Sequence, residues 1–380
     1  MRAGRSFPLL SSEVKGPAPP GVQERASDKL WFACLGDGIY RSGMRTLVVG
    51  IGALGGTIGT RALSAGLPVW LATRSAGSAE RLRSSGLRVS GVGGEATASS
   101  IPVAALGDYA AETFELILLA TKAQDALDCA PFLSRLLVAG GTLLCIQNGG
   151  VSQIVAERLG GDLVLGGLSN LGATMVEPGI YEQRNAGHLL IGEVAGGGSD
   201  RAARIAAFLS GAIGTKATAN LPGAVWSKLL LNCSVTTLGA LAGQPMRRYM
   251  TVAAGPPVFR KTYEETLSVA LASGTRPERM IVDPLPPGWP GASAPAGEHA
   301  GWIAEITATY GDLKPSMLQD FERGRQTEID FINGYVAQLG QKLGVPVPMN
   351  AAITAMAHRI EQGQLRPHPD RLDDLLRTVA

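Results

Sequence analysis

The chain reads RTLVVGIGALGG at residues 45–56, an apolar run that leads directly into spaced glycines. The β-rich run 45–49 predicts a buried strand, and residues 55–64 predict a helix. In such a strand–turn–helix, Gly50 permits the tight turn, Gly52 lets a pyrophosphate approach the backbone, and Gly55 allows close helix–strand packing. The free N–H groups of the helix start bind phosphate oxygens. We therefore predict that a dinucleotide is bound by Gly50, Ile51, Gly52, Ala53, Leu54 and Gly55.

The residue after the second predicted strand, 68–73, distinguishes between the two nicotinamide cofactors. NAD-binding units of this kind usually carry Asp or Glu here, to bind the ribose 2′-hydroxyl, whereas this chain has Arg74. A guanidinium pairs with a 2′-phosphate through charge-assisted hydrogen bonds. The sequence therefore favours NADP(H). The alternative is that Arg74 is a solvated surface residue. Arg81 and Arg83 are further candidates for binding the 2′-phosphate.

Strands and helices alternate after this unit. Residues 114–120 and 141–146 predict two more buried strands, and residues 123–137 predict a helix between them. Near-continuous apolar strands that alternate with helices indicate a parallel, doubly wound sheet. Three strand-like segments without intervening helices follow, and they predict antiparallel strands at the sheet edge: 162–169, 179–183 and 188–192.

The pattern changes to helical spacing after Pro222. Residues 316–343 predict one long helix, because apolar residues recur there at three- and four-residue steps. Other helices are predicted at 224–242, 258–273 and 350–363. The Pro- and Gly-rich segment 276–301 predicts a long loop, which is either a lid or a disordered insert.

A chain of 380 residues is long enough for two domains. We predict an α/β fold with an N-terminal Rossmann-type doubly wound sheet at 44–220, and a C-terminal all-helical domain at 221–380 that binds substrate. Residues 1–43 mix Arg, Ser, Pro and Gly without a sustained period, so we expect a non-essential extension.

Composition limits the partners. The net charge of +2, without a basic run, argues against nucleic acid and membrane surfaces. The four cysteines are scattered, which predicts small buried residues in a reducing, cytoplasmic compartment: Cys34, Cys129, Cys145 and Cys233. No metal-ligand spacing and no catalytic histidine arrangement is evident. A homodimer through the helical domain is one option.

Four motifs, in the right order, resemble the ketopantoate reductase family. They are TKA at 121–123, IQNG at 146–149, WSKL at 226–229 followed by NC, and PSMLQD at 315–320 followed by TEIDFING at 327–334. The resemblance extends from Met44 to about Arg366. It implies a Rossmann domain followed by helices, and NADPH-dependent reduction of 2-dehydropantoate to (R)-pantoate for pantothenate and coenzyme A synthesis.

The chemistry needs a proton for the alkoxide that develops when a 2-oxo acid accepts a hydride, and a lysine ammonium can supply it. The resemblance implies that Lys228 is this acid and that Glu328 binds substrate and cofactor and organises the lysine. Without the resemblance, Lys228 in its Leu-rich helix is more typical of a snorkelling residue, and Glu328 of a solvated charge.

Further contacts are implied by the same resemblance. Substrate is bound by Ser316, Asn148, Asn232 and Lys122, of which Asn148 and Lys122 also bind cofactor. Asn232 lies four residues after the lysine, on the same helix face. The alternatives are a helix N-cap for Ser316, a turn for Asn148 and a loop charge for Lys122.

Three departures from the family pattern affect the substrate. Thr236 stands where well-known members carry a second asparagine, the region 243–250 lacks the asparagine expected to contact pantoate, and the insert 276–301 is longer than usual. A paralogue that reduces another 2-oxo acid or an imine is therefore the alternative enzyme. A non-catalytic NADP-binding regulator is the alternative of a different class, and the pairing of Lys228 with Glu328 argues against it.

Overall fold

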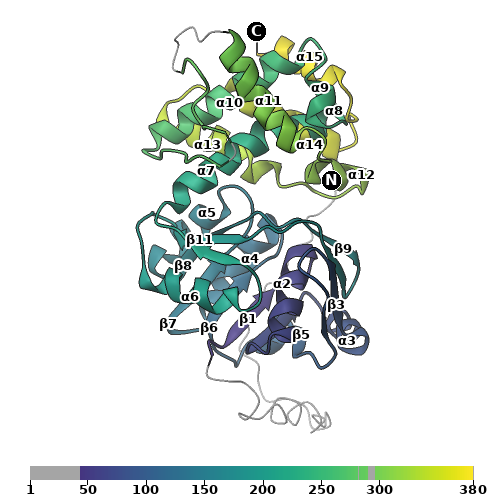
Figure 1. Cartoon of the computed structure of the whole chain (residues 1–380), viewed down its shortest axis with the longest axis vertical. Coiled ribbons are helices and arrows are strands. Elements are labelled where there is room, and N and C mark those ends of the chain that lie inside the picture. Colours follow the sequence, from purple (N-terminus) through teal and green to yellow (C-terminus); the bar gives the residue numbers. More distant parts are fainter. Residues whose placement is uncertain (1–42, 281, 290–295, 380) are drawn as a thin grey trace, which may run out of the picture.

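The computed structural model describes residues 43–280, 282–289 and 296–379. It has two parts, an α/β part and a helical part, which follow each other along the long axis of the molecule (Figure 1). The predicted N-terminal extension and Cys34 lie outside the described residues, apart from Gly43.

An eight-stranded sheet with the order β12-β11-β8-β7-β6-β1-β2-β5 forms the centre of the α/β part. Its strands are β1 (Thr46–Val49), β2 (Val69–Thr73), β5 (Val103–Ala105), β6 (Phe114–Leu119), β7 (Leu137–Cys145), β8 (Val164–Ser169), β11 (Leu189–Glu193) and β12 (Thr215–Ala217). Neighbours from β5 to β8 are parallel, and β11 is antiparallel to β8. The predicted parallel sheet with an antiparallel edge is thus confirmed.

Helices cover both faces of this sheet, so the strands β1, β2, β6 and β8 are almost completely buried. They are α2 (Ala53–Ser64), α3 (Ala76–Ser85), α4 (Ala123–Ser134), α5 (Val151–Leu159) and α6 (Asp200–Ser210), with short 3-10 turns η1 (Leu106–Tyr109) and η2 (Gly161–Leu163). Alternate residues of β1 contribute to opposite cores, Val48 to one and Leu47 to the other.

A second sheet, with the order β4-β3-β10-β9, corrects one prediction. It consists of β3 (Leu87–Gly91), β4 (Ala96–Ala98), β9 (Ala173–Glu177) and β10 (Ile180–Gln183). Residues 179–183 therefore do not extend the main sheet. Their alternation of exposed Ile180 and fully buried Tyr181 fits a sheet with one covered face, and the Tyr181 ring packs where a Cβ on Gly56 of α2 would lie.

The helical part begins with a continuous helical run, Leu221–Ala242, that consists of α7 (Leu221–Leu231), a π-helical segment η3 (Asn232–Thr236) and α8 (Thr237–Ala242). This run is long and apolar enough to cross a membrane, but 83% of its most apolar window is buried inside the protein. It is the central helix of a core that the other helices surround: α9 (Met246–Tyr249), α10 (Gly255–Ala272), α11 (Ala296–Tyr310), α12 (Ser316–Glu322), α13 (Asn333–Leu343), α14 (Pro348–Glu361) and α15 (Asp370–Thr378).

The predicted single helix over 316–343 is wrong. Helix α12 ends at Glu322, a turn follows, and a 3-10 segment η4 (Ile329–Phe331) precedes α13. The break begins at Gly324, whose φ of +61° is a left-handed conformation that an α-helix does not contain.

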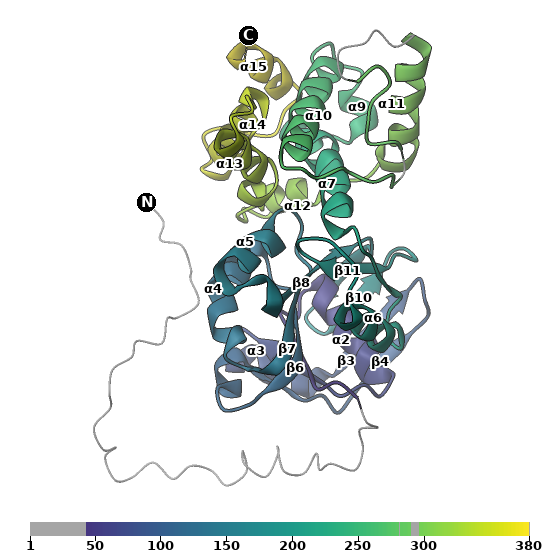
Figure 2. The ribbon, with the colours of Figure 1, turned by 90° about the vertical axis from the view of Figure 1, so that its left-hand side faces the viewer.

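The expected loop over 276–301 is also shorter than predicted, because α11 already begins at Ala296. Residues 281 and 290–295 lie outside the described residues. Two views place α7 and α12 at the end of the helical part that adjoins the α/β part (Figure 1 and Figure 2).

Candidate active site

A cavity of about 620 Å³ lies where the two parts meet, beside the glycine loop. The predicted site residues that line it are Gly50, Ile51, Gly52, Ala53, Leu54, Arg74, Lys122, Asn148, Lys228, Ser316 and Glu328. Two others do not line it: Gly55 packs inside the loop, and Asn232 lies in η3. Residues far apart in sequence are thus brought to one cavity.

The three glycines of the loop have different surroundings. A Cβ on Gly50, which has a φ of +92°, would lie 2.7 Å from the Thr121 backbone nitrogen. A Cβ on Gly55 would lie 2.1 Å from the Gly50 carbonyl oxygen. A Cβ on Gly52 would meet nothing within 4 Å. The open space at Gly52, next to the start of α2, can hold a phosphate group, while Gly50 and Gly55 allow close backbone packing.

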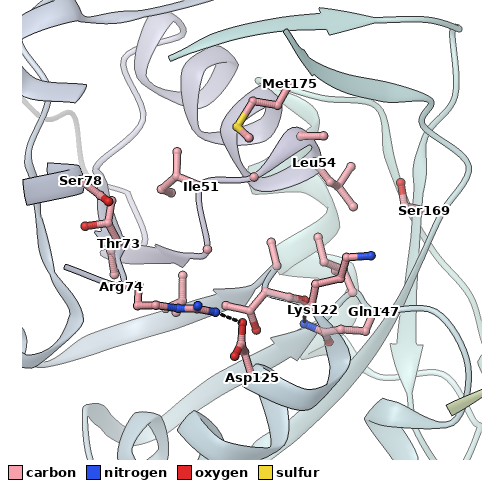
Figure 3. A pocket seen from close by; sticks show the side chains of 18 of the residues that line it. Ile51, Leu54, Thr73, Arg74, Ser78, Lys122, Asp125, Gln147, Ser169 and Met175 are labelled. Carbon is pink, nitrogen blue, oxygen red and sulfur yellow. Dashed lines mark hydrogen bonds and ion pairs between the residues drawn. The ribbon is translucent and has the colours of Figure 1, made fainter. Parts of the chain in front are cut away.

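One end of the cavity is cationic. Arg74 follows β2 and forms an ion pair with Asp125 of α4, and Figure 3 shows the two side chains facing each other. Arg81 lines the same end, together with the hydroxyl-bearing Thr73 and Ser78. Two guanidinium groups with hydroxyls nearby can bind a phosphate monoester. Asp125 also lines the cavity, and no sequence pattern predicted that this carboxylate would pair with Arg74.

Lys228 enters the cavity from α7, and its Nζ donates a hydrogen bond to the Ser169 carbonyl oxygen at 2.7 Å. Burial lowers the pKa of this ammonium group to about 8, and the negative charge of Glu328 acts in the opposite direction. A lysine with this pKa is mostly protonated at neutral pH and still releases its proton readily, which suits a general acid.

Lys228, Asn232 and Thr236 form a stripe at four-residue spacing along the central helical run. From Gly223 to Ala242 these three residues are partly exposed, whereas all the others are buried. The Thr236 hydroxyl donates to the Asn232 carbonyl oxygen at 3.0 Å, so the helix backbone already uses it. The polar stripe explains how a lysine reaches a cavity from a core helix.

Glu328 is not on a helix, contrary to the sequence-based expectation. It is the residue before η4, and its Oε1 accepts a hydrogen bond from the Ala123 backbone N–H at 3.0 Å. The N–H belongs to the first turn of α4, which favours a carboxylate. Glu328 therefore links the helical part to the α/β part at the cavity wall.

A second cross-link was missed in the sequence. Lys122 Nζ forms an ion pair with Asp320 Oδ2 at 2.9 Å, and Asp320 is buried. Gln124 Nε2 donates to the Thr327 carbonyl oxygen at 2.7 Å, between the same two segments. The only signal for Asp320 was its place in the PSMLQD motif, because no local pattern indicates a partner 198 residues away.

The remaining residues lie at the ends of elements. Ser316 is the first residue of α12 and lines the cavity, but no side-chain cap is formed there and Pro315 holds the N-cap position. Asn148 follows β7 beside Gln147, whose amide donates to the carbonyl oxygens of Leu119 and Thr121. Among the described residues, no cluster of three or more His, Cys, Asp or Glu could hold a metal ion.

Family models match both parts of the chain. Residues 46–196 match "Ketopantoate reductase PanE/ApbA", and residues 220–361 match "Ketopantoate reductase PanE/ApbA C terminal". The 2-dehydropantoate 2-reductase of Halobacterium salinarum is 29% identical over 308 residues, 80% of this chain and 95% of that protein. The corresponding protein of Archaeoglobus fulgidus is 27% identical over 321 residues, with 84% and 98% covered.

Solved structures show the same fold. A PanE/ApbA family ketopantoate reductase from Ralstonia eutropha is 26% identical with a TM-score of 0.70, over 84% of this chain and 99% of that one. A D-mandelate dehydrogenase in complex with NADH and anilino(oxo)acetate also has a TM-score of 0.70, at 22% identity, with 84% and 98% covered. The chain belongs to the ketopantoate reductase family of oxidoreductases, which act on a keto or secondary alcohol group with a nicotinamide cofactor.

Proposed function

We propose that the protein catalyses the NADPH-dependent reduction of 2-dehydropantoate to (R)-pantoate, a step of pantothenate and coenzyme A synthesis. The observation that carries this proposal is the position of Lys228, a lysine of lowered pKa in the same cavity as the glycine loop. The names of the curated relatives support the substrate.

The bound nicotinamide would supply a hydride to the substrate's carbonyl carbon. In this mechanism the Lys228 ammonium group donates a hydrogen bond to the carbonyl oxygen and transfers its proton as negative charge develops there. The Ser169 carbonyl oxygen orients the ammonium group, and the charge of Glu328 favours its protonated form. Ser316 and Asn148 bind the substrate from the cavity lining. Asn232, one helical turn after Lys228, binds the part of the substrate that extends beyond this lining along the polar stripe.

The cofactor is proposed to be NADPH rather than NADH. Gly50–Gly55 and the start of α2 bind the pyrophosphate, and Arg74 binds the 2′-phosphate with Arg81 beside it. Lys122, Asn148 and Glu328 lie near the nicotinamide ribose in this arrangement. The ion pair with Asp125 holds the Arg74 guanidinium at the cavity wall.

A second candidate function is the reduction of another 2-oxo acid, or of an imine. Thr236 favours it, because its hydroxyl bonds to the helix backbone and the stripe then has one polar group fewer for the substrate. A comparison of kcat/KM for 2-dehydropantoate and phenylglyoxylate, an aromatic 2-oxo acid, tests the two candidates. A clear preference for 2-dehydropantoate supports the main proposal, and a clear preference for phenylglyoxylate supports the second.

The domain division is a proposal as well. We propose a cofactor domain at 44–220 and a substrate domain at 221–380, since the last strand, β12, ends at Ala217 and α7 begins at Leu221.

We also propose a cytoplasmic location and a homodimer. A relative from Staphylococcus aureus is described as dimeric. Light scattering of the purified protein measures the oligomeric state directly.

A further inference from the structure

The turn that carries Glu328 is anchored by hydrogen bonds to α14. Thr327 is fully buried, and both its backbone N–H and its hydroxyl donate to Glu361 Oε1, at 2.8 and 2.7 Å. The Thr327 hydroxyl also accepts from the Ile329 N–H at 3.3 Å. These bonds fix the backbone at the residues immediately before and after Glu328. They therefore determine the position from which the Glu328 side chain extends to the cavity.

His358 of α14 lies between Glu361, which holds Thr327 before Glu328, and Asp330, which follows Glu328. Its Nδ1 lies 3.0 Å from Glu361 Oε2, and its Nε2 lies 2.9 Å from Asp330 Oδ1. Ionised carboxylates only accept hydrogen bonds, and a neutral imidazole has only one N–H to donate. The protonated imidazolium is therefore the form of His358 that satisfies both contacts.

The surroundings of His358 favour this protonated form. Burial lowers its pKa, but the hydrogen bonds and charges of Glu361 and Asp330 outweigh burial, so the pKa lies above its usual value. These two carboxylates, one on α14 and one on η4, are the charged groups that act on His358 among the described residues.

We propose that His358, as an imidazolium, is a positioning residue of the reductase. It ties Glu361 and Asp330 together, and these hold the turn so that Glu328 keeps its bond to Ala123 and its influence on Lys228. The proposal rests on the proposed reductase function. It assigns a role to a residue that lies outside the cavity and touches neither substrate nor cofactor.

Deprotonation of His358 leaves two facing carboxylates with one N–H between them. His358 then keeps a hydrogen bond to only one of the two carboxylates, Glu361 or Asp330, and the position of Glu328 is less well fixed. Reductase activity therefore has a second requirement for a proton, in addition to that of Lys228, and kcat falls as the pH rises through the pKa of His358. NADPH affinity falls much less than kcat, because the glycine loop and Arg74, which bind the pyrophosphate and the 2′-phosphate, take no part in this network.

Folding stability changes in the same direction. A histidine whose pKa is raised on folding contributes stability below its unfolded pKa, and this contribution is lost as the pH rises through the folded pKa.

Two substitutions at this position separate positioning from simple packing. His358→Gln removes the titrating charge, and His358→Lys keeps a positive charge that can lie between both carboxylates. We expect His358→Gln to lower kcat by about ten- to a hundredfold near pH 6, as misplacement of a catalytic group does. We expect His358→Lys to restore most of kcat and to remove the pH limb that belongs to the histidine.

His368→Gln is the matched control. His368 belongs to the same helical part and pairs with Asp370 at 3.2 Å, but its side chain is exposed and takes no part in the network of Thr327, Asp330 and Glu361. We expect its kcat and pH profile to equal those of the wild type. Wild-type kcat and an unchanged pH profile in His358→Gln would overturn the proposal. Equal losses in the Gln and Lys variants, with weaker NADPH binding in both, would indicate a merely structural role and also overturn it.

Two further measurements keep the test independent of folding and of the proposed function. If His358→Gln does not fold, Glu361→Gln replaces it: this variant retains acceptors for Thr327 and lowers the pKa of His358, so the pH limb moves to lower pH. The pKa of His358 is also measured by NMR in the NADPH-loaded wild type. A value at or below the usual 6.5 overturns the proposal even if no 2-oxo acid is reduced, whereas absence of turnover alone contradicts only the reductase function.

Discussion

The two walls of the cavity are built in different ways. The cofactor wall comes from two segments close in sequence, Gly50–Gly55 and the end of β2 with Arg74, and it depends on the close backbone packing that Gly50 and Gly55 allow. The opposite wall comes from α7, α12 and the turn before η4, with Lys228 and Glu328 one hundred positions apart in the chain. Cofactor binding is therefore a local property of the sequence, whereas the chemistry depends on tertiary contacts that join the two parts.

Removal of the proposed general acid should give the largest difference between the effect on turnover and the effect on cofactor binding. We expect Lys228→Ala to lower kcat by about 10²- to 10⁴-fold, the usual contribution of a general acid, and to leave NADPH affinity within about twofold. Stopped-flow fluorescence for NADPH binding and steady-state kinetics measure the two effects. Lys342→Ala, at an exposed position of α13, is the control. A parallel loss of binding and turnover would mean that the walls are not independent.

On the cofactor wall, Arg74→Ala should weaken NADPH binding by about ten- to a hundredfold, since hydrogen bonds between charged groups contribute about 1.5–3 kcal/mol each. NADH binding should hardly change, because NADH has no 2′-phosphate. Arg88→Ala is the control, as Arg88 is similarly exposed and also pairs with a carboxylate, that of Glu95. Equal effects on both cofactors would contradict the assignment of Arg74.

Two glycines of the loop separate binding from folding. Gly52 has a φ of −81°, and a Cβ there meets open space, so Gly52→Ala should fold normally but weaken NADPH binding about tenfold, or about 1.4 kcal/mol. Gly55→Ala should lower the free energy of unfolding by about 1–3 kcal/mol, because its Cβ overlaps the Gly50 carbonyl oxygen. Thermal unfolding without cofactor and NADPH titration distinguish them, and a reversed pattern would refute the roles given to these residues.

The pH dependence of turnover gives the smallest effect near neutrality. Lys228 must be protonated to act and its pKa is about 8. In His358→Lys, which lacks the histidine limb, kcat/KM should therefore fall about twofold between pH 7 and 8, about fivefold between pH 8 and 9, and about tenfold per unit above that. Glu328→Gln removes the charge that raises this pKa, so the limb should move to lower pH. The limb should persist in His358→Lys. A flat profile to pH 10 would exclude Lys228 as the acid.

The sequence predicted those features that depend on neighbouring residues. The helix predicted at 123–137 occurs as α4, which begins at Ala123 as expected, and the strand–glycine–helix unit occurs where the apolar run and the glycines indicated it. The family assignment and the fold class are confirmed. These features follow from periodicity and from backbone requirements that a short window contains.

Features that depend on distant contacts were missed. The spacing of Ile329, Ile332 and Val336 suits one long helix as well as a 3-10 turn followed by a helix, so the break at Gly324 stayed hidden. The bonds of Thr327 to Glu361 and of Lys122 to Asp320 likewise have no local pattern. The second sheet escaped prediction for the same reason, since pairing of β10 with β3 joins segments about ninety residues apart.

The most direct test of the central claim is whether the protein couples NADPH oxidation to the reduction of a 2-oxo acid. Purified protein is mixed with NADPH and 2-dehydropantoate, and the nicotinamide absorbance and the pantoate formed are measured together. The account predicts one NADPH oxidised for each pantoate, and loss of this reaction in Lys228→Ala with NADPH still bound. Tight NADPH binding without oxidation by 2-dehydropantoate or any other 2-oxo acid would contradict it and favour a non-catalytic NADPH-binding regulator.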